Sequence, residues 1–381
     1  MEETQQYTMG KLFTLEYGKP VPDKESIDGS VPVYGTNGQI GTSHLKPLCN
    51  HPSVILGRKG AYRGVHYSNR PFSVIDTAFY IELITDKVDI KWLYYKLLTY
   101  DINSMDSGSA IPSTDRYQIY SLPIEVPSIN TQRRIVDVLD SITTKIELNR
   151  QINDNLEQQA QALYRSWFVD FEPFKDGNFI ESELGLIPED WKVVELGEVT
   201  KHITEKVKNR SDVKVLSPVT TGELVLSEEY FTKQVFSESI AKYITVKPLQ
   251  FAYNPARVNI GSLGMNTFEF DGCVSPVYVV FECERDYQYF FDYFRKTDSF
   301  KEEVLARAIG GVRQSLSYKD FSLIKLIYPP RAIVEKFNRL YSKILENINH
   351  NKVESNNLAD MRDTLLPKLM SGELKINDLD C

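Results

Sequence analysis

Residue types that could perform catalysis do not form a complete motif in this sequence. Asn254–Arg257 (Asn-Pro-Ala-Arg) resembles the Asn/Asp-Pro-Pro-aromatic motif of amino-methyltransferases, but it lacks the second proline and the aromatic residue that stacks on a flipped base. Gly57–Gly60 lacks the spacing of a phosphate-binding loop. The four cysteines and five histidines show no metal-site spacing and no disulfide framework. We therefore predict a non-catalytic chain without a cofactor or a metal.

Basic side chains, in contrast, gather in windows without Asp or Glu, although the net charge is −8. These windows cover residues 29–75, 239–268 and 304–319. Arginine can hold a phosphate or a guanine edge, and Asn and Gln amides match adenine. Each window alone is also compatible with an ordinary solvated surface. From the windows and the adjoining loops we predict these DNA-contacting residues: Asn37, Lys46, Arg58, Lys59, Tyr62, Arg63, Arg70, Ser109, Lys242, Arg257, Asn259, Arg307, Arg313 and Gln314.

The elements expected to position these residues occur in the same order in both halves of the chain. Short strands, a basic turn-rich loop, a further strand, a short helix and a Gly-containing loop precede a last strand in each half. The strands and short helix expected in the first half are 31–34, 53–56, 74–83 and 92–98, and those in the second half are 250–253, 277–281 and 289–294. The sequence therefore predicts an internally duplicated α+β protein.

A long heptad-patterned helix of about 35 residues, roughly 50 Å, is expected to close each half. A shift of 202 residues superposes the two patterns. The predicted helix-pair core is Ile135, Ile142, Asn149, Leu156, Leu163, Phe337, Ile344, Asn351, Leu358 and Leu365, and the same apolar stripe includes Ile152, Leu340 and Met361. Pro367 should break the second helix, and Ser371–Gly372 should close it.

Asn149 and Asn351 occupy equivalent positions near the midpoints of the two predicted helices. A polar residue in an apolar seam is unfavourable unless it has a polar partner. In an antiparallel pair the midpoints meet, so the two amides could bond each other. The alternative is that each asparagine points to the solvated edge of the seam.

Three sequence segments resemble the conserved regions of type I restriction-modification specificity subunits. These segments are Ser166–Phe174, Gly185–Trp191 and Leu365–Leu374. Gly57–Gly60 and the Gly/Ser loops before the long helices are similar to parts of that family's target recognition domains. The resemblance covers nearly the whole chain.

The resemblance implies two α/β target recognition domains separated by an antiparallel pair of long coiled-coil helices. The expected boundaries are domain 1 at 1–130, helix 1 at 131–168, a linker at 169–190, domain 2 at 191–331, helix 2 at 332–370 and a tail at 371–381. It also implies a bipartite, asymmetric DNA site and a complex with two methyltransferase subunits and restriction-translocase subunits. Trp167, Phe168, Phe171 and Phe174 are expected to bind a partner, to form core, or to do both.

Two other classes of protein remain open at this point. One is a coiled-coil scaffold with two protein-binding domains, and the other is a stand-alone DNA-modifying enzyme. No apolar run approaches the roughly 20 residues that cross a bilayer, and the acidic, polar N-terminus does not resemble a secretory signal. We therefore expect no membrane partner and a cytoplasmic location.

Overall fold

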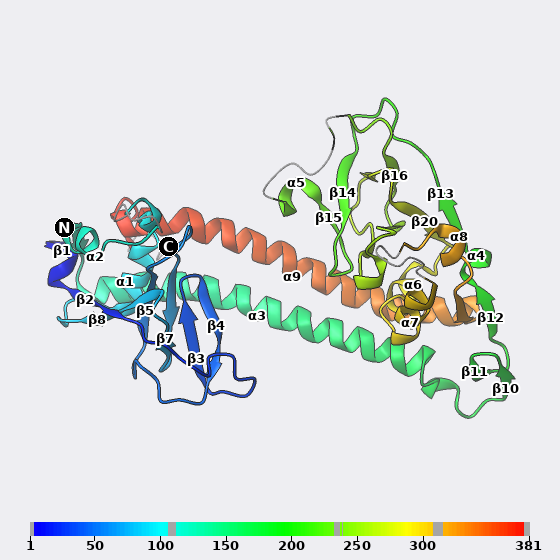
Figure 1. Cartoon of the computed structure of the whole chain (residues 1–381), viewed down its shortest axis with the longest axis horizontal. Coiled ribbons are helices and arrows are strands. Elements are labelled where there is room, and N and C mark those ends of the chain that lie inside the picture. The colour runs from blue at the N-terminus through cyan, green and yellow to red at the C-terminus, as the bar shows by residue number, and fades with distance from the viewer. Residues whose placement is uncertain (1–3, 106–111, 232–236, 238, 308–314, 377–381) are drawn as a thin grey trace. The chain divides into compact units, whose positions relative to one another are not determined.

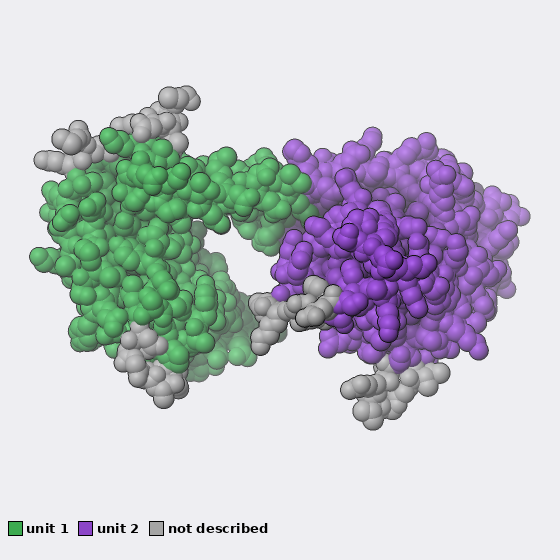
Figure 2. Space-filling model, turned by 90° about the horizontal axis from the view of Figure 1, so that it is seen from above, with its two compact units in different colours: residues 1–151, 351–381 green, residues 152–350 purple. Residues whose placement is uncertain are grey.

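The computed structural model describes residues 4–105, 112–231, 237, 239–307 and 315–376. The chain forms two compact units (Figure 2): unit 1 comprises residues 1–151 and 351–381, and unit 2 comprises residues 152–350. Two long helices, α3 (Ile129–Phe168) and α9 (Arg331–Ser371), contribute segments to both units (Figure 1). None of the helices within these described ranges is long and apolar enough to cross a membrane.

Unit 1 is built on two small sheets and a strand pair. One sheet has the order β2-β8-β5-β6, the second has the order β4-β3-β7, and β1 pairs with β9. The bounds are β1 Gln5–Thr8, β2 Phe13–Tyr17, β3 Val31–Gly35, β4 Gly38–Ser43, β5 Ser53–Gly57, β6 Val65–Ser68, β7 Ser73–Val74, β8 Ala78–Leu83, β9 Pro123–Val126, α1 Ile90–Leu97 and α2 Arg116–Ser121. Trp92 and Leu93 of α1 are buried in the same core as Leu56 of β5 and Leu139 of α3.

Unit 2 contains the remaining described strands and short helices. Their bounds are β10 Phe179–Ser182, β11 Gly185–Pro188, β12 Lys192–Glu195, β13 Thr200–Ile203, β14 Lys214–Pro218, β15 Leu224–Leu226, β16 Ile244–Val246, β17 Phe251–Tyr253, β18 Leu263–Met265, β19 Gly272–Val274, β20 Val279–Cys283, β21 Lys325–Tyr328, α4 Leu196–Val199, α5 Ser227–Tyr230, α6 Gln288–Phe294, α7 Asp298–Arg307 and α8 Tyr318–Phe321. Its core is rich in aromatic rings, including Phe251, Phe281, Phe290 and Phe321.

The sheets of the two units have the same internal order. In unit 2 the order β13-β20-β17-β18 matches β2-β8-β5-β6, and β15-β14-β19-β16 matches β4-β3-β7 with one strand added. The pairing directions agree as well, because β3 pairs parallel with β7, and β14 pairs parallel with β19. The strand pair β1-β9 corresponds to β12-β21. The internal duplication predicted from the sequence is therefore confirmed at the level of topology.

Within each unit the segments of α3 and α9 run antiparallel. In unit 1, Ile135 and Leu139 share a core with Leu369 and Met370, while further along α3 the Nζ of Lys145 lies 3.0 Å from the carboxylate of Glu354. In unit 2, Asn153 donates to the main-chain oxygen of Ile348 at 3.4 Å, and Phe168 packs against Phe337 with ring centroids 5.1 Å apart. Rising numbers on α3 thus meet falling numbers on α9 in both units.

Asn149 lies in the buried seam of unit 1, as the sequence predicts, but with a different partner. Its side chain is 0% exposed, and its amide donates to the carboxylate of Glu354 at 2.7 Å and the hydroxyl of Ser355 at 3.3 Å. The contact with Asn351 is a longer one, 3.5 Å to the main-chain oxygen. The expected polar contact at the midpoint is present, and a carboxylate takes the place of the predicted second amide as its main acceptor.

Three residues assigned to the apolar stripe lie outside the seam. Ile152, Leu340 and Met361 are 39%, 45% and 51% exposed. Buried positions on the helices are instead taken by Ala160, Tyr164, Val334 and Tyr341. An α-helix has 3.6 residues per turn, so a strict seven-residue pattern drifts around its surface, and neighbouring residues take over the buried face.

The end of α9 and the segment after α3 also differ from expectation. The helix continues through Pro367 to Ser371, because proline near a C-terminus removes one hydrogen bond without ending the remaining turn. Gly372, at φ 75°, then closes the helix as predicted. The expected linker at 169–190 contains a β-hairpin, in which Phe179 of β10 pairs with Pro188 of β11.

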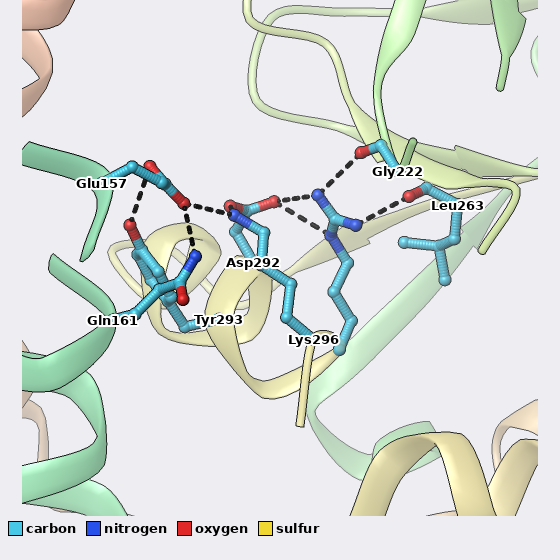
Figure 3. A network of polar contacts seen from close by, with 8 residues as sticks. Glu157, Gln161, Gly222, Leu263, Asp292, Tyr293 and Lys296 are labelled. Atoms are coloured by element: carbon cyan, nitrogen blue, oxygen red, sulfur yellow. Dashed lines mark hydrogen bonds and ion pairs between the residues drawn. The ribbon is translucent and has the colours of Figure 1, made fainter. Parts of the chain in front are cut away.

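A polar network, buried at Asp292 and Arg295 and partly exposed at Lys296 and Glu157, joins α3 to α6 and to the sheets of unit 2 (Figure 3). Arg295 donates to the main-chain oxygens of Gly222 and Leu263 at 2.9 and 2.8 Å, and it pairs with Asp292 at 2.6 Å. Lys296 bridges Asp292 at 3.1 Å and Glu157 of α3 at 3.3 Å. The network therefore anchors the second half of α3 to its own unit.

Candidate nucleic-acid interface

The loop between β5 and β6 of unit 1, residues 58–64, is held in place through its main chain. The amides of Arg58 and Lys59 donate to the oxygen of Thr77 at 2.8 and 3.1 Å, and Thr36 donates its hydroxyl proton to the oxygen of Lys59 at 2.8 Å. A side chain at Gly57 would place its Cβ 2.7 Å from the Cα of Arg63, so this position requires glycine. The loop thus has a defined shape from which its side chains project.

The segment just before α2 is hydrogen-bonded to this loop. The amide of Gly60 donates to the oxygen of Pro112 at 3.0 Å, and the amide of Thr114 donates to the oxygen of Arg58 at 2.8 Å. The next residue, Asp115, caps the N-terminus of α2 by accepting from the amide of Tyr117. The structure therefore brings together the loop at 57–60 and the end of the Gly/Ser loop, two segments that the sequence analysis had singled out separately.

Two arginines share one exposed tyrosine ring beside this loop. The guanidinium carbon of Arg58 lies 4.8 Å, and that of Arg116 lies 5.3 Å, from the centroid of Tyr17, whose side chain is 45% exposed. Arg116 also donates to the hydroxyl of Tyr117 at 3.0 Å, which raises the pKa of Arg116 above its usual value. We call Tyr17, Arg58, Arg116 and Tyr117 the Tyr17 cluster. Cation–π stacking holds both guanidinium groups at the surface.

Most residues of the Tyr17 cluster were not predicted from the sequence. The prediction included Arg58 but not Tyr17, Arg116 or Tyr117, which come from the end of β2 and the start of α2. The acid-free window at 29–75 contains neither segment, so charge distribution alone could not find them. The N-cap signal at Asp115, which begins a helix directly after the Gly/Ser loop, is the local feature that could have found Arg116.

The other residues predicted in unit 1 lie in several surroundings. Lys59 is half-buried and pairs with Asp76 at 3.4 Å. Arg63 is only 2% exposed, and its guanidinium donates to the main-chain oxygens of Gly60 and Asn103 at 3.1 and 2.7 Å. A buried guanidinium is not available to a phosphate, so Arg63 is better described as a brace within the loop. The residues on the exposed surface are Asn37, Lys46, Tyr62 and Arg70, whereas Ser109 lies outside the described residues.

Unit 2 holds its corresponding loop, residues 254–262, in the same way. The amide of Leu316 donates to the oxygen of Pro255 at 3.1 Å, and Leu316 is related to Thr114 by the 202-residue shift. The next residue, Ser317, caps α8 as Asp115 caps α2. The side chains differ, because Tyr318 stands where Arg116 stands in unit 1 and stacks on His202 at 4.5 Å. Burial lowers the pKa of His202 and thereby favours its neutral form.

The DNA-contacting residues predicted in unit 2 also lie in several surroundings. Lys242 and Arg257 are exposed, and Arg257 directly precedes the 3₁₀ turn Val258–Ile260, in which Asn259 is half-buried. Arg307, at the end of α7, forms an ion pair with Glu303 at 2.8 Å. Arg313 and Gln314 lie outside the described residues. Arg257 therefore places an exposed cationic side chain within the loop at residues 254–262.

The aromatic residues proposed for partner binding belong mainly to the core of unit 2. Phe168 and Phe171 are 5% and 9% exposed, and Trp167 and Phe174 are partly buried against the same cluster. Phe171 and Phe174 both contact the ring of Trp191, with centroids 5.3 Å away. These contacts place the four residues in or against the core, as one part of the expectation has it, and partner binding by the group stays a prediction.

Comparisons with known proteins agree with this arrangement. Residues 1–158 match the family model described as type I restriction modification DNA specificity domain. The chain is 26% identical over 311 residues to the type I restriction enzyme MjaIX specificity subunit of Methanocaldococcus jannaschii, which covers 77% of this chain and 71% of that protein. It is also 26% identical over 348 residues to the HindI specificity subunit of Haemophilus influenzae, which covers 74% of each.

A solved structure shares the fold of this chain. The crystal structure of a type I restriction-modification system S subunit from M. genitalium matches with a TM-score of 0.64 and 16% identity, and the match covers 97% of this chain and 96% of that one. The chain is therefore similar in sequence and in fold to type I restriction-modification specificity subunits.

Proposed function

We propose that this chain is the non-catalytic, DNA-reading subunit of a type I restriction-modification complex in the cytoplasm. It recognises a bipartite, asymmetric site on double-stranded DNA, one part through each unit. In unit 1 the contacts come from the Tyr17 cluster together with Lys59, Tyr62, Asn37, Lys46 and Arg70, and in unit 2 they come from Arg257, Lys242 and Asn259. Ser109, Arg307, Arg313 and Gln314 remain in the proposal as further contacts.

The observation that carries this proposal is the common main-chain frame of the two loops. Thr114 bonds to Arg58 in one unit and Leu316 bonds to Pro255 in the other, so the same scaffold presents two loops. Main-chain bonds fix loop shape whatever the side chains are, and side chains then provide hydrogen bonds to base edges and phosphates. Such a division of roles suits a protein that reads sequence.

The difference between the two loops supports an asymmetric target. Unit 1 presents two arginines on a tyrosine, whereas unit 2 has the stacked His202 and Tyr318 at the related place. A pair of guanidinium groups suits phosphate or guanine, whereas the uncharged stack offers surface to a sugar or a base. The two units therefore should prefer different half-sites.

We further propose that the helices set the spacer between the half-sites and dock two methyltransferase subunits, through which restriction-translocase subunits join. Exposed apolar side chains suit such docking, and in unit 1 they include Leu148 of α3 and Val353 and Met361 of α9, which are 48%, 59% and 51% exposed. The methyltransferase partners would supply S-adenosylmethionine chemistry, so this chain needs no cofactor of its own.

The test begins with methylome sequencing of a host that carries the intact system, which identifies the target. Binding of a fluorescent duplex is then measured for the complete chain with its methyltransferase partners over a range of salt concentrations. The double variant R58E/R116E should bind more weakly at every salt concentration. The slope of log Kd against log salt should fall by about one to two, because each lost phosphate contact removes about one released counterion.

The matched control reverses two exposed lysines outside the Tyr17 cluster, K11E/K343E, and changes the net charge by the same amount. It should leave the salt slope close to that of the original chain. If R58E/R116E behaves like this control, DNA contact does not depend on the Tyr17 cluster. That result would favour the alternative of a coiled-coil scaffold with two protein-binding domains. Methylation of the target by the chain alone would instead favour the stand-alone enzyme.

A further inference from the structure

Three side chains with metal-binding atoms converge beside the start of β5 and the end of β8 in unit 1. They are Cys49, His51 and Glu82, and one ligand atom from each lies within 4.8 Å of the other two. The imidazole of His51 lies between the other two groups, with its ring nitrogens 3.7 Å from the Sγ of Cys49 and its Nε2 3.0 Å from a carboxylate oxygen of Glu82. The Tyr17 cluster contains none of these residues.

The backbone holds all three positions. Cys49 exchanges two main-chain hydrogen bonds with Phe72, at 2.9 and 3.0 Å. Directly after His51 and Pro52, the hydroxyl of Ser53 donates to the oxygen of Ile81 at 2.5 Å, which ties the start of β5 to β8 next to Glu82. The three ligands therefore come from chain segments that the sheet already fixes, and little ordering would be needed to close around an ion.

The two distances from the His51 imidazole are close to those around a small tetrahedral cation, and the three ligand atoms all lie within 4.8 Å of one another. Zn²⁺ binds sulfur at about 2.3 Å, nitrogen at about 2.0 Å and carboxylate oxygen at about 2.0–2.2 Å, so ligand atoms around it lie roughly 3.3–3.6 Å apart. The Nε2 of His51 lies 3.7 Å from the Sγ of Cys49 and 3.0 Å from a carboxylate oxygen of Glu82, which is close to these values. A mixed sulfur, nitrogen and oxygen set suits Zn²⁺, whereas Mg²⁺ and Ca²⁺ prefer oxygen alone.

We infer that Cys49, His51 and Glu82 form a binding site for Zn²⁺ or a cation of similar chemistry, with water as the fourth ligand. The ion would link the segment before β5 to β8 and stabilise this part of unit 1. Cys49 is 2% exposed, whereas the side chains of His51 and Glu82 are 50% and 38% exposed, so an ion could enter from the solvent side. This inference departs from the sequence expectation of no metal and does not depend on the DNA-binding proposal.

The chain offers a matched control in a second histidine–carboxylate pair. The Nε2 of His44 also lies 3.0 Å from a carboxylate oxygen, that of Asp28, and both side chains are exposed, at 55% and 87%. The His44–Asp28 pair is not part of the group formed by Cys49, His51 and Glu82, which includes a thiol. An exposed ion pair of this kind is common on protein surfaces, and it provides the comparison for a site that includes sulfur.

The probe is Co²⁺, which replaces Zn²⁺ and gives a sulfur-to-metal charge-transfer band when a thiolate binds it. The complete chain, purified without metal, is titrated with Co²⁺, and Zn²⁺ is then added to displace it. We expect one equivalent to produce the band and Zn²⁺ to remove it. His51→Ala and Cys49→Ser should abolish the band, and Glu82→Gln should weaken binding by at least about tenfold, the lower end of what supporting residues around a metal contribute.

His44→Ala should keep the band at its original strength. A band that is missing from the original chain, or that survives both His51→Ala and Cys49→Ser, would overturn the inference, since another cysteine would then be the ligand. Circular dichroism checks the fold of each variant. Should Cys49→Ser fail to fold, His51→Ala decides the outcome alone, because that side chain is half-exposed.

Discussion

Asp292 illustrates how a single charge can be kept inside this protein. The residue is 6% exposed, and burial on its own would raise the pKa of its carboxyl group. The opposing charges of Arg295 and Lys296 outweigh burial, and the net effect is a lowered pKa. A carboxyl group whose pKa is lowered by folding stabilises the fold above its unfolded pKa and loses that contribution as the pH falls through its folded value.

The pH dependence of stability therefore gives a prediction for Asp292. Thermal unfolding of the original chain should shift to lower temperature as the pH falls from the usual range of an aspartate, about 4, toward the lowered pKa of the folded Asp292 carboxyl. Asp292→Asn should lower stability at neutral pH by about 3 kcal/mol, because Arg295 and Lys296 lose their charge partner. It should also flatten the acid dependence. Asp298→Asn, at a side chain that is 92% exposed, serves as the control and should change neither quantity.

At this scale the sequence predicted surface charge better than it predicted contacts. Arg58 and Arg257 were selected because they lie in windows without Asp or Glu, and the structure places both in loops. Tyr17 and Arg116 were not selected, because their proximity arises only when β2 and α2 fold beside the β5–β6 loop. Arg63 was predicted to contact DNA because it is a basic residue beside Arg58 and Lys59, but the structure shows that its side chain is buried.

The long helices carry the clearest sequence signal among the elements. Their heptad pattern predicted two helices, and the structure has α3 and α9 at 40 and 41 residues. The pattern could not predict which neighbours replace Ile152, Leu340 and Met361 on the buried face, because that depends on the local twist of each pair. Short strands such as β7 and β19 have little periodic pattern in the sequence, because they contain only two and three residues. They form by pairing with strands that are distant in the sequence.

The polar contact between Asn149 and Glu354 in the helix seam yields a second prediction. Glu354 accepts from Asn149 at 2.7 Å and pairs with Lys145 at 3.0 Å, so Glu354→Ala leaves a buried amide without its main acceptor. We expect a loss of about 1–3 kcal/mol in the free energy of unfolding, measured by denaturant titration. Glu346→Ala, at an exposed position of the same helix, should stay within about 0.5 kcal/mol of the original chain. Equal effects of the two substitutions would contradict a stabilising role for the seam contact.

At the scale of the whole molecule, the proposed spacer function gives a third prediction. If the helices set the distance between half-sites, one added heptad in both α3 and α9 should lengthen the spacer. Seven residues add about 10 Å of helix, which corresponds to about three base pairs of DNA. Methylome sequencing of a host with the extended protein measures the new spacer directly.

Two features make this experiment specific. Both helices must be extended together, after Gln151 and before Asn351, because an insertion in only one would misalign the antiparallel segments seen within each unit. The half-site sequences should remain unchanged, since the loops of both units are not altered. A spacer of the original length in the extended protein would show that the helices do not measure it.

The main-chain bonds from Thr114 to Arg58 and from Leu316 to Pro255 have a consequence for how such a protein can diversify. Peptide groups are the same for every residue except proline at the donor, so side chains in these loops can be exchanged while the frame persists. Mutation could thus change the preferred target without first weakening the fold. A lineage carrying this scaffold could acquire new DNA preferences one substitution at a time, and it could inherit each half of its target separately from the other.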